Sequence, residues 1–569
     1  MRGPSFPHRW PGAGPLPLAL LALALCLCTA CDRLPGASAL RLTYVVTIPE
    51  VAGNGAIVEV RVDGPPPRGF RMLLPPRGNR RELRALAPDS TTGGDPKGPH
   101  VLRYTVRAPE APHGGRSFAC YRGFELLAQP AGVLSPDADS VVLEFRIPEH
   151  LSVVAPLSLL AADPQAPARG AFAISEREFD TLLESYLAIG DYAVRVLPPV
   201  PRRLPAVVWG RRGLGEASEG ELIDVVERLL LAHSEHLGPD RPKEPYSVVV
   251  DYPYSGHGFA GNATGRSIDL RLSRDLGVAD SPGLVRLTSH ELAHFWLGGA
   301  YPFPKPEDHW FVEGAADYCG LRARVQAGFV DPADAGDELA AQWFDLSSNP
   351  WLHRPMEDLG RSFMLEPEAF TASYARGCLT VWALEWRAAQ AGRPGIAAVL
   401  DENARTREHA SMRSLLSTHL KSATPGPDNP AADVGALLGP EPEPAFTRIL
   451  ADAGLRYHAV PTRDLTFGLE RFEPGTTRLV AVPAGSPAEG AGVKPGDAIR
   501  AVDGYPVFDT IQLQEAMERS FSRPAYKLEG MVVEYERAGL TERVRLFAAP
   551  QVEARWLDDK GERATRIFP

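Results

Sequence analysis

The sequence is short of positive charge, of cysteine and of long apolar runs, and each shortage excludes a class of protein. Its net charge is -11 at pH 7 and no long run of lysine and arginine appears, which argues against a nucleic-acid partner. Only 6 of its 569 residues are cysteine, too few for a disulfide framework. The 44% hydrophobic content is that of a globular protein, and the length is too great for one core, so three or four domains are expected.

The N-terminal apolar run is too short for a comfortable membrane span and suits the core of a signal peptide. Arg2 and Arg9 precede the run "LPLALLALALCLCTAC", which ends at Cys31. Small residues before a cysteine resemble a bacterial lipoprotein cleavage site, so we expect a signal peptide over residues 1–31 with Cys31 as the lipidated first residue. Plain secretion with cleavage near Ala30 is the alternative. The lipoprotein reading places the protein in the bacterial cell envelope, anchored to a membrane and facing the periplasm or the exterior.

Few cysteines remain after such a signal is removed. They are Cys31, Cys120, Cys319 and Cys378. Cys319 and Cys378 could form a disulfide in an oxidising compartment, whereas isolated buried thiols are the expected state.

Three patterns follow one another along the mature chain. Residues 38–200 alternate apolar and polar positions, as in "AIVEVRVDG" and "DSVVLEFRIP", which predicts an antiparallel β domain. Residues 206–455 are mostly helical in pattern, apart from strand-like "YSVVVDY" and "SIDLRL". A compact strand-rich unit follows over residues 460–552. The expected fold class is therefore multidomain α+β.

The stretch "SPGLVRLTSHELAHFWLGG" predicts a helix that carries a metal-binding pair. His290 and His294 are four residues apart and so share one face of such a helix. Two neutral imidazoles placed in this way can bind one Zn²⁺, and Glu291 is close enough to activate a water molecule beside the metal. The alternative is a solvated helix surface. The flanking residues predict the helix boundaries, with Ser281 as the N-cap, Pro282 as the first residue and Gly298-Gly299 as the stop.

A catalytic zinc ion needs a third protein ligand and an open fourth position. A second helical pattern, "HWFVEGAADYCGLRARV", contains Glu313, with 18 residues between it and His294. Glu313 therefore suits the third ligand. Asp317 follows one turn later on the same face, where it suits an acceptor for the free N–H of a ligand histidine.

At this separation, "HELAHFWLGG" and "HWFVEGAADY" resemble the motifs of the alanyl-aminopeptidase-type zinc peptidases and of their relatives, the glycyl aminopeptidases. The resemblance implies an N-terminal β domain and a thermolysin-like catalytic domain that binds zinc. In these families a tyrosine in a Tyr-x-Lys-Gly pattern stabilises the tetrahedral intermediate. The stretch "SYARGCLTVWALEW" puts Tyr374 at that place, with Arg376 instead of the lysine and Gly377 after it. A packed core tyrosine is the alternative for Tyr374.

The segment before the zinc helix departs from the family pattern. The relatives bind a free N-terminus with an acidic residue there, in Gly-Ala-Met-Glu-Asn or a stretch like Gly-Leu-Glu-His. Here "YSGHGFAGNATGRSIDLRL" has the glycines, and its strand could pair with a peptide through Gly261 and Asn262, or the stretch is an ordinary flexible turn. It has no carboxylate between residues 252 and 268. The acidic residue that would bind a free N-terminus is therefore missing, unless Asp251, Asp269 or a distant acid takes that role. The missing carboxylate weakens the prediction of an aminopeptidase, and an endopeptidase or an exopeptidase with altered recognition of the chain end fits equally well.

The C-terminal unit resembles a PDZ domain of the bacterial protease type. The resemblance lies in "LTFGLE" and in the later "VPAGSPAEGAGVKPGDAIRAVDGYPV". It implies that Phe467, Gly468 and Leu469 present backbone N–H groups to the C-terminal carboxylate of a peptide. A domain that serves only as a packing partner of the peptidase is the alternative.

Together these patterns predict an exported zinc metallopeptidase that acts on peptides or proteins. The competing hypothesis is a peptide-binding envelope protein that uses the cleft and the PDZ domain and has little or no catalysis. The presence of Glu291 and Tyr374 favours the enzyme, and the missing carboxylate favours the binding protein.

Overall fold

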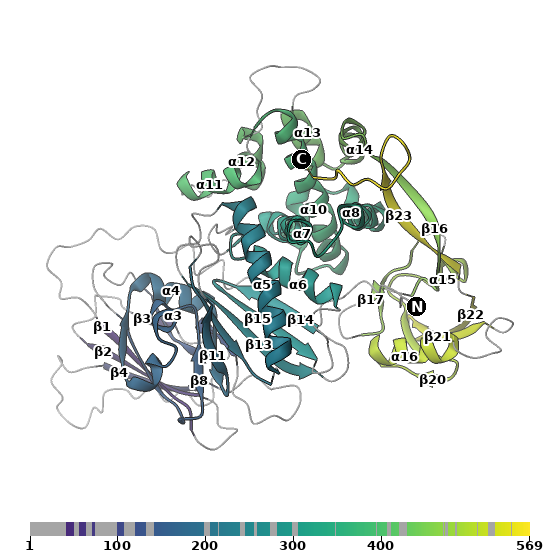
Figure 1. The fold of residues 1–569 in the computed structure, drawn as a ribbon. Coiled ribbons are helices and arrows are strands. Elements are labelled where there is room, and N and C mark those ends of the chain that lie inside the picture. Colours follow the sequence, from purple (N-terminus) through teal and green to yellow (C-terminus); the bar gives the residue numbers. More distant parts are fainter. Residues whose placement is uncertain are drawn as a thin grey trace. The chain divides into compact units, whose positions relative to one another are not determined.

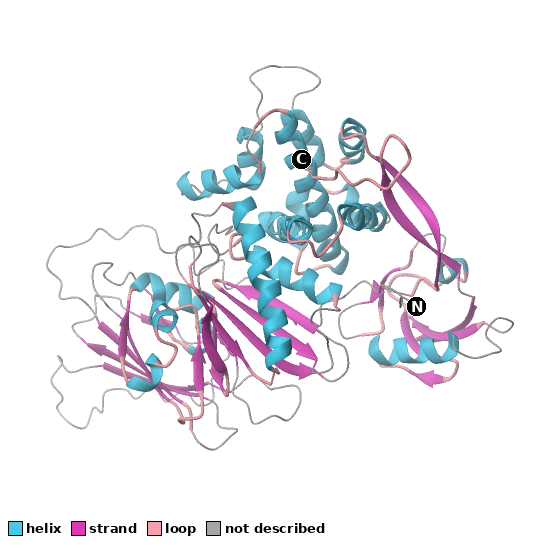
Figure 2. Ribbon diagram, viewed as in Figure 1, coloured by secondary structure: helices cyan, strands magenta, loops and turns pink. Residues whose placement is uncertain are grey.

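The computed structural model places strands mainly in the first half of the chain and helices in the middle (Figures 1 and 2). Contacts between residues divide the chain into two compact units, with the boundary in the sequence between residues 300 and 301. Within the described ranges, no helix is long and apolar enough to cross a membrane. Residues 1–40, with the predicted signal peptide and Cys31, lie outside the described residues. Those described are 41–49, 56–63, 71–73, 100–106, 120–131, 141–197, 205–213, 215–238, 245–254, 259–273, 281–298, 305–347, 349–393, 395–406, 411–419, 430–469, 471–472, 476–483, 486–508, 510–521, 530–547 and 549–568.

The first unit begins with a five-stranded sheet in the order β4-β2-β1-β7-β9. Every other residue of β2 is buried, as expected of a strand with one face on a core. The sheet is not purely antiparallel as the sequence predicts, because β1 runs parallel to β7. A parallel pair needs a long crossover, and the chain between β1 and β7 supplies it. The strands are β1 (Arg41–Thr47), β2 (Ala56–Asp63), β4 (His100–Val106), β7 (Val141–Arg146) and β9 (Phe172–Ile174).

Short strands and helices complete this part, and one apolar core joins them to the first sheet. Two buried tyrosines tie the core to the segment after α2. The Tyr44 hydroxyl donates to the carbonyl of Ala128 over 2.6 Å, and the Tyr104 hydroxyl donates to Leu126 and accepts from the Ala128 N–H. The elements are β3 (Arg71–Leu73), β5 (Cys120–Arg122), α2 (Gly123–Leu126), β6 (Gln129–Ala131), β8 (Ser152–Val154), α3 (Ser158–Ala162), a 3-10 turn (Ala166–Arg169), α4 (Glu176–Glu184) and β10 (Tyr186–Gly190).

A second five-stranded sheet, in the order β11-β12-β13-β15-β14, closes the first unit and carries two helices. Its inner strands β12, β13 and β15 are parallel, and β12 and the start of β13 are almost wholly buried, as parallel strands usually are. Strand β14 runs antiparallel to β15 at one edge. The elements are β11 (Ala193–Leu197), β12 (Val207–Arg211), α5 (Glu216–Leu237), β13 (Tyr246–Tyr254), β14 (Phe259–Thr264), β15 (Ser267–Ser273) and α6 (Pro282–Ala293).

The second unit is helical up to about residue 452, with α10 at its centre. This helix contacts α7, α8, α9, α13 and α14. Cys319 and Cys378, on α7 and α10, are buried thiols that form no disulfide, the expected state. The elements are η2 (Pro306–Asp308), α7 (His309–Gln326), α8 (Pro332–Ser347), η3 (Pro350–His353), α9 (Met356–Ser362), α10 (Pro367–Gln390), α11 (Ile396–Thr406), α12 (Met412–His419), α13 (Pro430–Leu437) and α14 (Glu443–Asp452).

A long two-stranded ribbon of β16 and β23 brackets the C-terminal module, which has an apolar core of its own. After β23 the chain returns to the helices, where the Trp382 indole N–H donates to the carbonyl of Ile567 over 2.7 Å. The elements are β16 (Arg456–Thr466), β17 (Arg471–Phe472), β18 (Leu479–Ala481), α15 (Pro487–Gly490), β19 (Ala498–Val502), β20 (Tyr505–Pro506), α16 (Thr510–Phe521), β21 (Met531–Arg537), β22 (Leu540–Leu546) and β23 (Ala549–Leu557).

Tyr104→Phe tests the buried tyrosine contact. Removing the hydroxyl leaves the Ala128 N–H and the Leu126 carbonyl short of a buried partner, which should lower the free energy of unfolding by about 1–3 kcal/mol. Urea unfolding followed by tryptophan fluorescence measures the loss. Tyr505→Phe, at a side chain 54% exposed, is the matched control and should change stability by less than about 0.5 kcal/mol. Equal stability of both variants would contradict the assigned role of the Tyr104 hydroxyl.

Candidate metal centre

Helix α6 carries the histidine pair and begins where the sequence predicts. The Ser281 Oγ accepts a hydrogen bond from a backbone N–H of the first turn, and Pro282 is the first helical residue. The regular helix ends at Ala293, before the predicted stop at Gly298, whose φ is +94°. His294 therefore lies at the C-cap, yet its φ of -65° and ψ of -13° remain helical. Its ring consequently stays on the histidine face of the helix.

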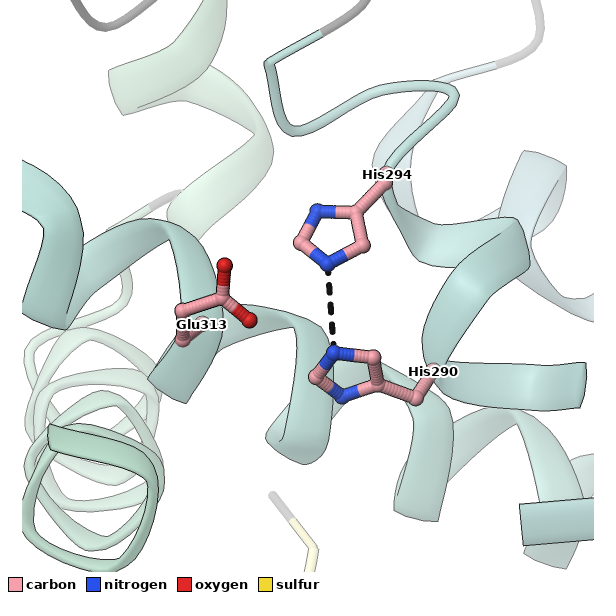
Figure 3. A group of neighbouring side chains, drawn as sticks. All are labelled: His290, His294 and Glu313. Atoms are coloured by element: carbon pink, nitrogen blue, oxygen red, sulfur yellow. Dashed lines mark hydrogen bonds between the residues drawn. The ribbon is translucent and has the colours of Figure 1, made fainter. Parts of the chain in front are cut away.

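The two histidine rings and one carboxylate come together (Figure 3). The Nε2 atoms of His290 and His294 are 3.1 Å apart, and one ligand atom from each histidine and from Glu313 lies within 4.8 Å of the other two. The Nδ1 atom of His294 is 3.2 Å from the carbonyl of Leu297, a distance at which Nδ1–H donates and leaves the Nε2 lone pair turned inward. Two imidazoles and one carboxylate are a donor set that fits Zn²⁺.

Glu313 lies in the second turn of α7, half buried. His309, one turn earlier, is also half buried; burial lowers its pKa, and the negative charge of Glu313 partly opposes that shift. Asp317 follows one turn after Glu313. The hydrogen bond that holds His294 runs to a backbone carbonyl, and the role of Asp317 as a histidine acceptor stays a prediction.

The edge strand β14 passes directly beside Glu291. A Cβ atom at position 261 would lie 3.0 Å from the Glu291 Cγ and 3.2 Å from side-chain atoms of Leu270 and Leu287. Only glycine lets the strand run this close to the helix without displacing the carboxylate. Glu291 itself is 2% exposed. Gly261, predicted to bind substrate, therefore adjoins the predicted general base.

The other predicted residues of this segment lie on the opposite face of the sheet. Successive side chains of a strand alternate between faces, so Asn262 points away from the α6 side, as does Asp269, its partner across β15. Asp251 forms an ion pair with Arg212 at 2.6 Å, and Asp269 pairs with Arg271 at 3.1 Å. Burial raises the pKa of both carboxyls, that of Asp269 to about 6. Both acids are thus engaged in ion pairs on the face away from Glu291.

A buried histidine of α5, which no sequence pattern indicated, contacts the backbone of α6. His233 of α5 is fully buried, with its Nε2 2.9 Å from the carbonyl of Ser289, the residue before the first histidine of the pair. Its ring centroid is 5.9 Å from that of Trp296. Burial lowers the pKa of His233 to about 4, so the neutral ring donates to the carbonyl at pH 7. No local motif marks this residue, because the contact spans 56 positions.

Helices α7 and α10 touch backbone to backbone. A Cβ atom at Gly314 would overlap the main chain of Gly377, and one at Gly377 would overlap the carbonyl oxygen of Trp310. Glu313 immediately precedes one of these glycines, and Tyr374 lies one turn before the other. The contact therefore fixes the separation of the two helix segments that carry Glu313 and Tyr374.

Tyr374 is half buried in an aromatic cluster. Its ring centroid lies 5.0 Å from that of Phe370 and 5.9 Å from that of Phe363, which in turn lies 5.6 Å from the ring of His309. The four-residue spacing of Phe370 and Tyr374 on a helix could have indicated this contact from the sequence. The cluster restricts the tyrosine ring while leaving it partly accessible.

The predicted carboxylate-binding loop of the C-terminal module is partly buried. Phe467 and Leu469 are 7% and 3% exposed and belong to the core of the module. Gly468 has a φ of +78°, and a Cβ atom there would overlap Ser486. The residue between the two apolar side chains must therefore be glycine for steric reasons. Peptide binding by this loop stays a prediction.

Comparison with known proteins agrees with this architecture. A family model described as PDZ domain matches residues 479–523, which confirms the PDZ domain predicted from the sequence. An aminopeptidase N family protein from Idiomarina loihiensis has a similar structure, with a TM-score of 0.61 and 16% identity over 93% of this chain and 100% of that one. The chain thus shares the overall fold of that protein. No curated protein sequence matches the chain.

Two further solved structures are similar at lower TM-scores. An M1 zinc metallopeptidase from Deinococcus radiodurans has a TM-score of 0.43 and 16% identity, over 72% of this chain and 95% of that one. A mutant M1 zinc metallopeptidase from the same organism, bound to a Tyr-Ser-Ala substrate, has a TM-score of 0.43 and 17% identity, over 72% and 97%.

Gly377→Ala tests the contact between α7 and α10. The added methyl overlaps the Trp310 carbonyl, so the helices must separate, and we expect a loss of about 1–3 kcal/mol in the free energy of unfolding. Thermal unfolding followed by circular dichroism measures it. Gly435→Ala in α13, where a Cβ meets nothing within 4 Å, should be neutral or stabilising. A Gly377→Ala variant as stable as Gly435→Ala would show that the helices are not in contact there.

Proposed function

We propose that this chain is a zinc-dependent metallopeptidase. The observation that carries the proposal is the convergence of His290, His294 and Glu313, with Glu291 on the same helix as the histidine pair. The glycine at 261, the aromatic cluster around Tyr374 and the fold shared with an aminopeptidase N family protein support it. A carboxylate beside a three-ligand zinc site is suited to hydrolysis, because it can move the protons of an attacking water.

Zinc, when bound by His290, His294 and Glu313, would supply a Lewis acid that polarises the peptide carbonyl and acidifies water. Glu291 takes the proton from the attacking water and passes it to the leaving amine. Tyr374 donates a hydrogen bond to the carbonyl oxygen as that oxygen gains negative charge. Burial of Glu291 excludes bulk water, which strengthens each of these electrostatic interactions.

The substrate proposed is an extended peptide. Strand β14 lies at the sheet edge beside Glu291, where a peptide could add as a further strand with main-chain hydrogen bonds. Asp251 and Asp269 are paired with arginines on the other face, which makes them poor candidates for binding a substrate ammonium. Internal cleavage is therefore as well supported as removal of N-terminal residues.

We further propose that the protein is exported and that Cys31 anchors it to a membrane through lipid. The PDZ domain would then offer peptide C-termini a binding site through Phe467, Gly468 and Leu469. A peptide-binding protein with little catalysis remains the competing reading, because Glu291 and Tyr374 could persist in a chain that no longer turns substrate over.

The first experiment separates these readings. The chain from Asp32 onward is incubated with a peptide pool of which half has free and half has acetylated N-termini, and the products are read by mass spectrometry. Loss of single residues from free ends only would indicate an aminopeptidase, and internal cuts in both halves would indicate an endopeptidase. Glu291→Gln should keep its zinc but lose about 10²–10⁴ in kcat. If wild type binds zinc and cuts nothing, the peptide-binding reading replaces the enzyme.

Tyr374→Phe tests the oxyanion role. Loss of one donor to the developing negative charge should lower kcat by about 10²–10³ with little change in KM, because the interaction forms only in the transition state. Steady-state kinetics on a cleaved peptide measures the effect. Phe370→Leu, which alters the same aromatic cluster without removing a hydroxyl, is the control and should lower kcat far less. An unchanged kcat in Tyr374→Phe would remove the tyrosine from the mechanism.

A further inference from the structure

A buried guanidinium lies behind Tyr374 on α10. Arg376 is 2% exposed, and two residues along a helix turn the side-chain direction through about 200°. Tyr374 therefore faces the aromatic cluster with Phe363 and Phe370, while Arg376 projects from the opposite side of the helix. The two side chains belong to one rigid turn and share its orientation.

Arg376 donates to four backbone carbonyl oxygens. Its Nη1 reaches Trp351, at 3.3 Å, and Arg354. Its Nη2 reaches Leu437, at 3.1 Å, and Gly439. Across the described ranges no carboxylate forms an ion pair with Arg376, and the charges of Glu357 and Glu443 act on it only from a longer distance. The carbonyl oxygens are therefore its direct partners.

The four acceptors lie at the ends of two helices. Trp351 lies in the short helix η3 and Arg354 is its C-cap, while Leu437 is the last residue of α13 and Gly439 follows two residues later. Carbonyls at a helix end carry partial negative charge, which suits a buried cation, although the Trp351 carbonyl also accepts from the Arg354 N–H. Arg376 therefore joins α10 to two other segments at once.

Lysine could not make the same set of contacts. The guanidinium is planar and directs hydrogen atoms from two separate nitrogens toward two pairs of acceptors, whereas an ammonium directs three from one point. Burial lowers the pKa of Arg376 to about 10, so the group stays charged at neutral pH. The arginine in "YARG" is therefore specific to this arrangement of carbonyls.

We propose that Arg376 is a positioning residue that holds Tyr374 in its catalytic orientation by fixing the opposite side of α10. Gly377 fixes the same turn against α7, so the helix segment is held from both sides. The inference rests on the proposed peptidase function. A rotation of α10 by about 10° would move the tyrosine hydroxyl by about 1 Å, because the hydroxyl lies far outside the Cα cylinder. Such a displacement can lower a rate by about 10².

The test is a double-mutant cycle in the full-length chain, measured on the peptide of the mixed pool that wild type cleaves fastest. Arg376→Lys should lower kcat by about 10- to 100-fold with KM within about threefold. In a Tyr374→Phe background the same change should lower kcat by less than about threefold, since the hydroxyl it positions is already absent. Arg387→Lys is the matched control, because Arg387 is on the same helix, paired with Asp433 at 2.6 Å, and should leave kcat unchanged.

A second readout does not depend on activity. With 3-fluorotyrosine placed at position 374, wild type and Arg387→Lys should give one common ¹⁹F resonance, and Arg376→Lys a shifted or split one. Gly439→Ala replaces Arg376→Lys in this test if Arg376→Lys does not fold. A Cβ atom at position 439 would lie 3.0 Å from the Gly435 carbonyl oxygen. The substitution therefore displaces one acceptor of Arg376 without altering the sequence of α10. Gly439→Ala should lower kcat and alter the ¹⁹F resonance in the same direction as Arg376→Lys, but by smaller amounts.

Two results would overturn the proposal. One is wild-type kcat in Arg376→Lys, and the other is an equal loss with and without the Tyr374 hydroxyl. If wild type cleaves nothing, the proposed peptidase function fails, and the ¹⁹F spectrum alone decides whether Arg376 positions the Tyr374 ring. In that case an unaltered resonance in Arg376→Lys overturns the positioning role, and an altered one supports it.

Discussion

The crossing of α7 and α10 at Gly314 and Gly377 determines the geometry of the candidate centre within the second unit. Two main chains in direct contact have no rotamers with which to adjust their separation, so the distance between the helices is set by van der Waals radii alone. Glu313 and Tyr374 both lie within one turn of this contact. Whatever moves one helix moves a predicted zinc ligand relative to a predicted oxyanion donor, which explains why the two motifs each place a glycine close to the reactive side chain.

Backbone carbonyl oxygens recur as the groups that orient the polar side chains of this region. His294 contacts the carbonyl of Leu297, His233 that of Ser289, and Arg376 four carbonyls at the ends of two helices. A backbone carbonyl in an ordered segment has no rotamers of its own, so it loses little conformational entropy when it accepts from a donor. This arrangement orients the buried donors without adding carboxylates, which would compete with the predicted ligand Glu313 for a metal ion.

Short-range patterns predicted much of this molecule from its sequence. The start of α6 and the strands at "YSVVVDY" and "SIDLRL" were predictable because turn residues and alternation act locally. The PDZ domain was predicted from its resemblance to a known family, and the buried thiols from the small number of cysteines. The parallel pairing of β1 with β7 was not, since register between distant strands depends on the whole core. The early end of α6 at Ala293 was also missed.

The spacing of the site residues could be judged from the sequence, but their surroundings could not. His290, His294 and Glu313 were predicted as a group and lie together. No pattern in the sequence indicates that Asn262 faces away from Glu291, or that His233 of a different helix contacts α6. Arg376 looked like a mild substitution for lysine, because its four acceptors come from segments that only tertiary structure brings together.

The path of the chain through the C-terminal module has a consequence for biosynthesis. Trp382, at the centre of the helical unit, is covered by Trp556 at a centroid distance of 4.7 Å and donates to Ile567. A ribosome makes Trp382 long before it makes these partners. The face of Trp382 that packs on Trp556 therefore stays uncovered until the PDZ segment and β23 have followed, although Trp386 and Phe446 of the helical unit already contact the ring. During that interval the PDZ module, which has a core of its own, can fold first and bring the ribbon into place.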